Sequence, residues 1–447
     1  MINANDKEGL ACFNLNSNYG IAIDPNNVFW GIISKREDSK IVLSRKMLSL
    51  YEKVRNDLDK QMEEFRFSSQ LSAIYINPTD RCNANCPYCY IPERLRKNGS
   101  SMNGKQLEYV LEQIEEYFKG SKRKPVIIFH ASEPLLVKDI IFKVINDFSN
   151  QFYFGLQTNA LLLEEADVNF LKEHNVGVGI SLDSFEPKVN NSLRPTTQGR
   201  GNYRKATAAI EWFCGYEGLN VITTITRLNV THLPQMVEFL HTKKVPRVLF
   251  NPVRMTQKSA RSLQPDEKLL TKYFIEAIDK AIELSRISEH KIIIGNFANI
   301  ILGIVAPTAR RLMCDISPCG GGRSFLTITP SGDMIPCGEF IGLKGFSGGN
   351  IFKTSISEAM QSKPFKRIRS RVVEKIPECN RCVFRNICGA PCPAELYSLG
   401  NMYQKAIFCK FYKEIIKYAL KLIAEGKEKY LLRPDSLKNL EHEYELT

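Results

Sequence analysis

The sequence lacks the features that mark membrane-spanning, secreted and repetitive proteins. It has no uninterrupted run of about 18 or more apolar residues, so no transmembrane helix is predicted. Its first residues, MINANDKEGLACFN, show no basic segment followed by an apolar one, so no secretory signal is expected. It has no internal repeats and no low-complexity tract. These absences predict a cytoplasmic protein without a membrane partner.

The composition is that of an ordinary globular chain with a basic surface. The 447 residues are 43% hydrophobic and 24% charged, which allows a sizeable core in two or three domains, or in one large α/β barrel with additions. The net charge is +13, from 61 basic and 48 acidic residues. Such an excess can attract nucleic acid, anionic membranes or acidic peptides. We favour a solvated Lys/Arg-rich surface as the explanation, and we do not predict a nucleic-acid partner.

Cysteine is the one residue type that is unusual in number and placement. Among the 13 cysteines, three lie within eight residues near position 85, and eight lie between positions 314 and 409. A reducing cytoplasm disfavours disulfides. Short spacers between clustered cysteines therefore predict metal binding.

Residues 71–255 alternate short apolar runs with amphipathic ones. The predicted strands are Ala73–Asn77, Val126–His130, Phe152–Gln157, Val176–Leu182, Asn220–Ile225 and Arg247–Pro252, with helices such as Gly104–Phe118 and Leu233–Lys243 between them. Six such units predict an α/β fold, a partial (β/α)6 TIM-like barrel with parallel strands. Functional side chains gather at the carboxyl ends of barrel strands, and the first three cysteines follow the first strand.

The other segments flank this barrel. Residues 1–70 are predicted to form an α+β extension with a hairpin of 11–24 and 28–34, either a packing cap on the barrel or a substrate-docking region. We expect a helical bridge over 256–310, a small cluster-binding domain over 311–415, and a helix with a charged tail over 416–447.

The segment Asp80–Tyr90 contains Cys82, Cys86 and Cys89 in the spacing C-x3-C-x2-C. Three thiolates on one loop can bind three irons of a [4Fe–4S] cluster and leave the fourth iron open to a substrate. A zinc knuckle or a redox site are the alternatives, but structural zinc favours four ligands and no suitable fourth one lies nearby. At this motif the chain resembles the radical SAM superfamily. The resemblance implies that the open iron binds S-adenosylmethionine and that these cysteines are catalytic.

A second match to that family follows the second strand. The family's Gly-Gly-Glu-Pro corresponds here to Ala131-Ser132-Glu133-Pro134. The resemblance implies that Glu133 and Pro134 help to bind the cofactor's methionine end, with a hydroxyl contact from Ser132. Because Ala and Ser disfavour positive φ, either the turn avoids that conformation or the cofactor approaches differently.

Further polar residues lie where the family places its cofactor contacts. The resemblance implies cofactor-binding roles for Tyr88, Asn159, Ser181, Asp183 and Arg194. An arginine suits a carboxylate because its guanidinium can pair bidentately. The alternative for each is an ordinary polar residue at a strand end or in a loop.

The C-terminal cysteines resemble the SPASM domain, which binds two auxiliary [4Fe–4S] clusters. The resemblance assigns Cys314, Cys319, Cys337 and Cys392 to the first of these clusters, and Cys379, Cys382, Cys388 and Cys409 to the second. Two zinc sites are the alternative, and Cys314 is the least certain ligand because the usual pattern has seven cysteines. The two remaining cysteines, Cys12 and Cys214, are predicted to be buried small hydrophobes.

The domain pair resembles peptide and protein maturases. It implies S-adenosylmethionine and three [4Fe–4S] clusters as cofactors, a ribosomal precursor peptide (acidic or Cys-rich) as substrate, and a ferredoxin or flavodoxin as reductant. We expect thioether or carbon–carbon crosslinking, since Gly338 replaces the Asp of sulfatase-maturing members. Glu339 is a candidate catalytic base, or else an exposed loop carboxylate. The alternatives are oxidation of a small molecule such as an amino-sugar, a protein-activating maturase, and a non-enzymatic metal scaffold.

Overall fold

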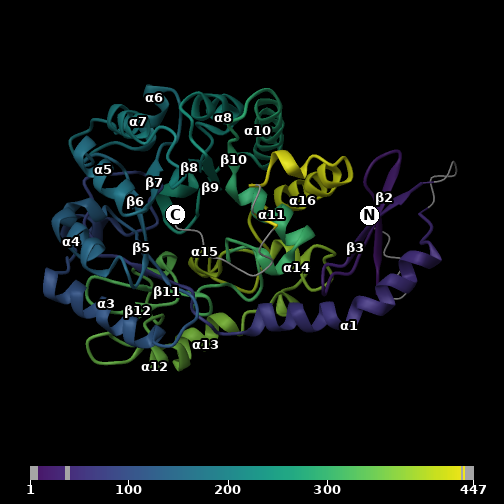
Figure 1. Cartoon of the computed structure of the whole chain (residues 1–447), viewed down its shortest axis with the longest axis horizontal. Coiled ribbons are helices and arrows are strands. Elements are labelled where there is room, and N and C mark those ends of the chain that lie inside the picture. The colour runs from purple at the N-terminus through teal and green to yellow at the C-terminus, as the bar shows by residue number, and fades with distance from the viewer. Residues whose placement is uncertain (1–8, 36–40, 434–435, 438–447) are drawn as a thin grey trace.

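The computed structural model describes residues 9–35, 41–433 and 436–437, and its centre is a large, mostly parallel sheet (Figure 1). Among the described residues, nine strands form this sheet in the order β10-β9-β8-β7-β6-β5-β4-β11-β12. Their bounds are β4 Ala73–Ile76, β5 Val126–Phe129, β6 Tyr153–Thr158, β7 Gly177–Ser181, β8 Leu219–Ile225, β9 Arg247–Pro252, β10 Ile293–Ile294, β11 Phe325–Ile328 and β12 Met334–Ile335. The α/β class and the six predicted strands are confirmed. The described edge strands β10 and β12 do not pair, so the sheet stays open.

Continuous burial explains the parallel strands. In β5 every residue is buried, as expected for a strand that is covered on both faces. Helix α3 buries Leu107, Val110, Leu111 and Ile114, which share one face at helical spacing, and it begins at a capping box formed by Asn103 and Gln106. No described helix has the length and apolar character needed to cross a membrane.

The helices follow the predicted alternation through the barrel and then continue into the C-terminal region. Their bounds are α1 Arg45–Phe67, α2 Glu93–Asn98, α3 Gly104–Phe118, α4 Lys138–Phe148, α5 Glu165–Glu173, α6 Pro187–Leu193, α7 Tyr203–Trp212, α8 Leu233–Thr242, α9 Lys258–Arg261, α10 Glu267–Ile287, α11 Gly295–Val305, α12 Ile356–Gln361, α13 Lys363–Arg369, α14 Arg385–Cys388, α15 Pro393–Ser398 and α16 Cys409–Ala424. Helix α16 packs on α10 and α11. The predicted charged tail lies largely outside the described residues.

Three strands of the sheet, β10, β11 and β12, were not among the predicted ones. Strand β11 lies in the C-terminal cysteine region, yet it pairs in parallel with β4, with Phe325 opposite Ala73. This pairing continues the sheet beyond the six predicted units. It also places the segment before Cys337 beside the strand that precedes Cys82.

The N-terminal extension differs from its prediction. It forms a three-stranded antiparallel sheet of β1 Ala11–Asn14, β2 Tyr19–Ile23 and β3 Trp30–Ser34, because a turn at 15–18 divides the first predicted strand. Its described polar contacts reach the bridge and the C-terminal region rather than the six-unit barrel. Trp30 Nε1 donates to the Ile304 carbonyl at 2.9 Å, and Asn386 Nδ2 donates to the Asn26 carbonyl at 2.7 Å. Helix α1 leads from this sheet toward the barrel (Figure 1).

The two spare cysteines also differ from expectation. Cys214 is exposed just after α7, so the prediction of a buried residue is wrong there, because the apolar side of that helix ends before it. Cys12 is half-buried.

Candidate functional site

A cavity of about 420 Å³ lies at the carboxyl ends of the barrel strands. Residues from the loop after β4, and from the ends of β5 through β9, line it together with the first C-terminal cysteines. Its volume suits a small organic cofactor or substrate. The strand-end rule therefore located this cavity correctly.

Cys82, Cys86 and Cys89 all line the cavity. Their loop is held by backbone bonds, among them Cys82 N–H to the Arg96 carbonyl at 3.0 Å and Cys89 N–H to the Cys86 carbonyl at 3.1 Å. Burial raises the pKa of Cys82 to about 12 and that of Cys86 to about 11, so the free thiols stay protonated. Metal binding displaces those protons, and three thiols from one loop are the donor set that a cluster with an open iron needs.

The loop after β5 keeps the backbone of the missing glycines. Ala131 has φ 70° and Ser132 has φ 49°, so both adopt the left-handed conformation. The idea that the turn avoids positive φ is therefore wrong. Ser132 Oγ donates to the Asp80 carbonyl at 2.7 Å, which ties this turn to the cysteine loop. Both residues line the cavity.

Glu133 is fully buried behind that lining. Its carboxylate accepts hydrogen bonds from Thr158 Oγ1 at 2.7 Å, Asn159 N–H at 2.8 Å and Leu135 N–H at 3.1 Å. Burial raises the pKa of Glu133 to about 7. The structure thus places Glu133 between the loops after β5 and β6. Pro134 starts the short helix Pro134–Val137 and also lies away from the lining.

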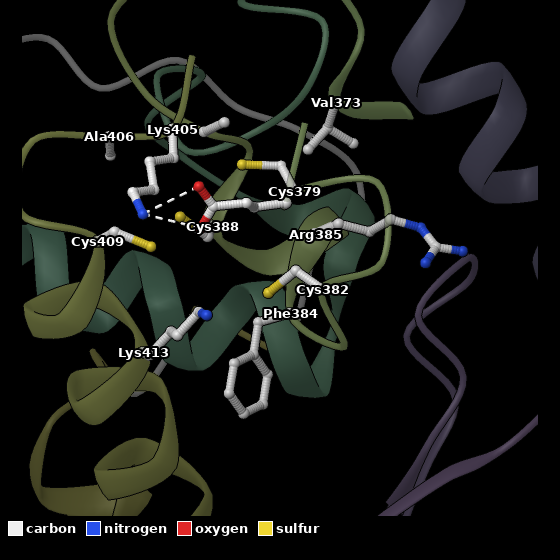
Figure 2. Close-up of a pocket in the computed structure, with 12 residues that line it drawn as sticks. Val373, Cys379, Cys382, Phe384, Arg385, Cys388, Lys405, Ala406, Cys409 and Lys413 are labelled. Carbon is white, nitrogen blue, oxygen red and sulfur yellow. Dashed lines mark hydrogen bonds and ion pairs between the residues drawn. The ribbon is translucent and has the colours of Figure 1, made fainter. Parts of the chain in front are cut away.

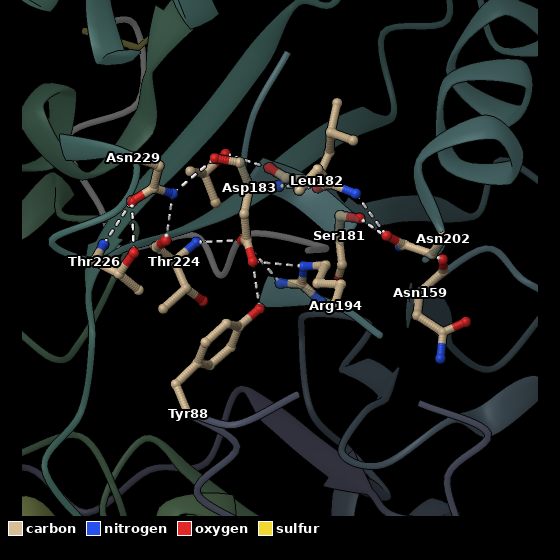
Figure 3. Close-up of polar contacts among 12 residues, drawn as sticks. Tyr88, Asn159, Ser181, Leu182, Asp183, Arg194, Asn202, Thr224, Thr226 and Asn229 are labelled. Carbon is tan, nitrogen blue, oxygen red and sulfur yellow. Dashed lines mark hydrogen bonds and ion pairs between the residues drawn. The ribbon is translucent and has the colours of Figure 1, made fainter. Parts of the chain in front are cut away.

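A buried ion pair links three of the predicted cofactor contacts, Tyr88, Asp183 and Arg194 (Figure 3). Arg194 Nε lies 2.9 Å from Asp183 Oδ2, and the side chains are 9% and 0% exposed. Asp183 also accepts from the Tyr88 hydroxyl and from Thr224 N–H, the latter at 2.9 Å. Burial opposes the charge on Arg194, but Asp183, Tyr88 and Cys86 together outweigh it and raise the pKa of Arg194 above its usual range.

This network separates the predicted contacts into two groups. Tyr88, Asn159, Ser181 and Arg194 line the cavity. Asp183 does not, and its carboxylate is used to hold Tyr88 and Arg194 in place. Asn159 additionally donates to Cys82 Sγ at 3.9 Å, which joins the cofactor candidates to the cysteine loop.

The first C-terminal set lines the same cavity as the barrel cysteines. Cys314, Cys319, Cys337 and Cys392 all contribute to its wall. Glu339 lies there too, with a buried Oε2 that has no hydrogen-bond partner among the described residues, so the alternative of an exposed loop carboxylate is wrong. Burial raises the pKa of Glu339 to about 7, and Arg254 opposes that rise.

The second set surrounds a separate small pocket. Figure 2 shows the sulfur atoms of Cys379, Cys382, Cys388 and Cys409 turned toward a shared space. No three His, Cys, Asp or Glu side chains of the described residues lie close enough to hold one metal ion. In a [4Fe–4S] cube each thiolate binds a different iron, so its ligands need not converge on one point. Four thiols around one space are a donor set that fits such a cluster.

Sequence reasoning assigned no role to Arg254, Tyr90 or His130, which all lie in the cavity wall. The Tyr90 hydroxyl and His130 Nδ1 are buried without hydrogen-bond partners in the part of the chain that is described. Burial lowers the pKa of His130 to about 4, so its ring is neutral. Arg254 follows the end of β9, and a polar residue just past a predicted strand was the signal that could have found it.

Comparisons with known proteins agree with this geometry. The radical SAM superfamily matches residues 76–240, and the SPASM iron–sulfur cluster-binding domain matches residues 319–383. An uncharacterized protein of Archaeoglobus fulgidus is 44% identical over 415 residues, which are 93% of this chain and 94% of that one. PqqA peptide cyclase of Bradyrhizobium diazoefficiens is 24% identical over 73% of this chain and 82% of its own length.

A solved structure has the same fold at low identity. The enzyme anSMEcpe, with bound AdoMet and the Cp18Cys peptide, superposes with a TM-score of 0.66 at 19% identity, covering 80% of this chain and 99% of that one. Sequence pattern, sheet topology and similarity thus agree, and the chain belongs to the radical SAM superfamily, as an enzyme with a C-terminal SPASM domain.

Proposed function

We propose that this enzyme is a maturase that crosslinks a ribosomally made peptide through a thioether or carbon–carbon bond. The observation that carries the proposal is the shared cavity. It is lined at once by Cys82, Cys86 and Cys89 and by the first C-terminal set. A peptide side chain bound in this cavity would lie between an initiating cluster and an auxiliary one.

Different residues at the barrel end would bind the cluster and the cofactor. Cys82, Cys86 and Cys89 would hold the first cluster, which with S-adenosylmethionine supplies the radical chemistry. Arg194, fixed by Asp183, would pair with a carboxylate of the bound cofactor. Tyr88, Ser132, Asn159 and Ser181 would complete the pocket wall around it.

Glu339 would take a proton from the substrate during bond formation. Its Oε2 faces no hydrogen-bond partner in the described residues, and a pKa near 7 suits a base that works near neutral pH. Its place beside Cys337 puts it within the same wall as the first auxiliary set.

The auxiliary cysteines would hold two further [4Fe–4S] clusters, with Cys314 as a full ligand. Closing a bond after hydrogen abstraction leaves one surplus electron, which the cluster of the first set would accept. A ferredoxin- or flavodoxin-like protein would supply electrons to the initiating cluster. The peptide substrate is supported by the names of PqqA peptide cyclase and of anSMEcpe bound to a peptide.

Anaerobic reconstitution tests this proposal. We expect about 12 iron atoms per chain, as three [4Fe–4S] clusters require. With dithionite and S-adenosylmethionine the protein should form 5′-deoxyadenosine. Small peptides encoded beside the gene should lose two hydrogen atoms, measured by mass spectrometry. Zinc in place of iron, or cleavage that survives loss of Cys82, would refute it, and turnover of an amino-sugar without any peptide product would refute the peptide substrate.

A further inference from the structure

Arg254 is a cation held inside the wall of the shared cavity. It follows β9 and lines the cavity together with Cys314, Cys319 and Cys392. Its guanidinium forms an ion pair with Glu395 at 3.4 Å, and the two side chains are 28% and 7% exposed. The exposed part of Arg254 thus faces the cavity beside the first auxiliary cysteine set.

A clamp fixes the position of this charge. Glu395 Oε1 accepts a hydrogen bond from Met255 N–H at 2.8 Å, so one carboxylate holds both the side chain of Arg254 and the backbone next to it. Glu395 belongs to α15, which begins directly after Cys392. These two contacts of Glu395 therefore connect the end of β9 to the segment that contains Cys392.

The surroundings keep Arg254 charged. Burial alone would lower the pKa of Arg254, but Cys392, Glu395 and Glu339 raise it well above its usual range. Arginine stays protonated in proteins, and the ion pair with Glu395 favours its charged form further. Arg254 is therefore a permanent positive charge in the wall that also contains Cys392.

We propose that Arg254 is a positioning residue that raises the reduction potential of the cluster held by Cys314, Cys319, Cys337 and Cys392, and that Glu395 lowers it. The inference rests on the proposed function, because it requires that cluster. Reduction adds one negative charge to the cluster, and a fixed cation nearby stabilises the reduced form more than the oxidised form. A fixed carboxylate has the opposite effect.

This tuning serves electron transfer in the crosslinking reaction. The substrate loses one hydrogen atom to the 5′-deoxyadenosyl radical, then one proton to Glu339 and one electron to the cluster as the new bond closes. The electron leaves more readily when the acceptor's reduced form is stabilised. Arg254 would thus act on product formation rather than on S-adenosylmethionine cleavage.

Redox titration of the anaerobic holoenzyme, followed by electron paramagnetic resonance, tests the inference. Arg254→Gln should lower the potential of one auxiliary cluster, with about a tenfold change in its oxidised-to-reduced ratio at fixed potential, or about 59 mV for one electron. Arg254→Lys keeps the positive charge, so its potential should lie close to that of the unmodified protein. Glu395→Gln keeps the acceptor for Met255 and should raise the potential.

Opposite shifts are the signature that a purely structural role would not give. If Arg254→Gln and Glu395→Gln move the potential in the same direction, or neither moves it, the inference is wrong. Arg66→Gln is the matched control, because Arg66 pairs with Glu374 at 2.8 Å outside the cavity wall. It should leave the potential unchanged, and a shift as large as that of Arg254→Gln would overturn the inference.

Iron content and 5′-deoxyadenosine formation separate the two possible failures. If the unmodified protein holds no auxiliary cluster, the proposed function fails and the inference with it. If iron content and cleavage are normal but the variants leave the potential unchanged, only the inference fails. If Arg254→Gln misfolds and loses iron, the inference is tested by Glu395→Gln alone. That variant should raise the reduction potential of the cluster, and an unchanged potential would overturn the inference.

Discussion

The two cysteine pockets differ in what surrounds the sulfur atoms. The cavity at the barrel end contains seven cysteines together with tyrosines, a histidine, two arginines and Glu339, whose Oε2 has no hydrogen-bond partner among the described residues. The second pocket holds four cysteines and is bordered by the exposed pair Lys405 and Glu378, 2.8 Å apart. Of these two pockets, only the barrel-end cavity has tyrosine and histidine side chains among its described lining residues. On the proposed function, the cysteines of the first pocket would serve the reaction, and those of the second would serve folding or electron transfer.

The sharpest test of this difference removes the barrel cysteines. Replacing Cys82, Cys86 and Cys89 with Ala should abolish 5′-deoxyadenosine formation and remove about 4 of about 12 iron atoms, because one cluster is lost. Iron analysis and chromatography of the nucleoside product measure both. Cys214→Ala, at an exposed cysteine outside both pockets, is the control and should change neither. If the triple variant still cleaves S-adenosylmethionine, the barrel cysteines are not the site of cleavage, and the proposed difference between the two pockets is wrong.

The complementary change is made in the second pocket. Cys388→Ala should also remove about 4 iron atoms, yet most S-adenosylmethionine cleavage should remain while peptide crosslinking is lost. The thermal midpoint should fall, because metal-binding energy contributes to folding. Mass spectrometry of the peptide and analysis of the nucleoside in the same samples give the ratio of crosslinked peptide to 5′-deoxyadenosine. A variant that loses cleavage as completely as the barrel triple variant would show that the two pockets do not act separately.

The same contrast shows how far sequence reasoning reaches. Cysteine spacing predicted the barrel group, because a short motif in one loop is local. The family resemblance predicted the division of the eight C-terminal cysteines, and the structure places these two sets in two different pockets. The six main strands also followed from local apolar runs. Strand β11 was missed because its partner, β4, lies about 250 residues away in sequence, and pairing at that distance leaves no local pattern.

Residue roles within the cavity were harder to predict than its location. Glu133 and Asp183 lie at positions where the family has cofactor contacts. The structure places both behind the cavity wall, where they form hydrogen bonds or ion pairs with other side chains. Burial of that kind depends on tertiary packing. The charge of Arg254 was visible in the sequence, but its pairing with Glu395 brings together residues 141 positions apart. The strained backbone at Ala131 is likewise set by the fold and not by its own preference.

The ion pair behind the barrel pocket is the next point at which to test the comparison. Asp183→Asn leaves Arg194 buried without its counter-charge, and breaking a buried pair in this way costs about 3 kcal/mol. Denaturant unfolding should show that loss, and equilibrium dialysis should show weaker S-adenosylmethionine binding. The control is Asp147→Asn, which breaks an exposed pair with Lys143 and should change stability far less, because solvent screens such a pair. Equal costs for the two variants would mean that Asp183 is not buried as described.

The buried carboxylate of Glu133 predicts a pH dependence confined to the barrel end. Its pKa is raised by burial from 4.5 to about 7, so the protonated form is favoured in the folded state. The contribution of Glu133 to stability is therefore fully present below pH 4.5 and is lost as pH rises through 7. Relative to Glu133→Gln, the wild-type protein should lose about 3 kcal/mol over that interval, as the pKa difference requires.

Unfolding midpoints of both proteins between pH 5 and 8 measure this effect. The matched control is Glu358→Gln, at a carboxylate whose pKa is lowered by its hydrogen bonds to Ser355. Its stability difference from the wild type should stay nearly flat across the same range. If the Glu133→Gln difference is also flat, burial does not raise the pKa of Glu133, and its carboxylate is ionised in the folded protein at neutral pH.

The smallest expected effect concerns the backbone turn that replaces two glycines. Ala131 has φ 70°, a conformation that costs a residue with a Cβ about 1–2 kcal/mol, whereas glycine adopts it freely. Glycine also gains more freedom in the unfolded chain, which offsets part of that relief. Ala131→Gly should therefore raise stability by up to about 1 kcal/mol, seen as a higher unfolding midpoint. Ala73→Gly, in β4, is the control and should lower it, because glycine weakens a strand. If Ala131→Gly is also destabilising, the packing of the Ala131 side chain in the cavity wall stabilises the fold by more than its backbone strain costs. The alanine would then be a packing residue of the site.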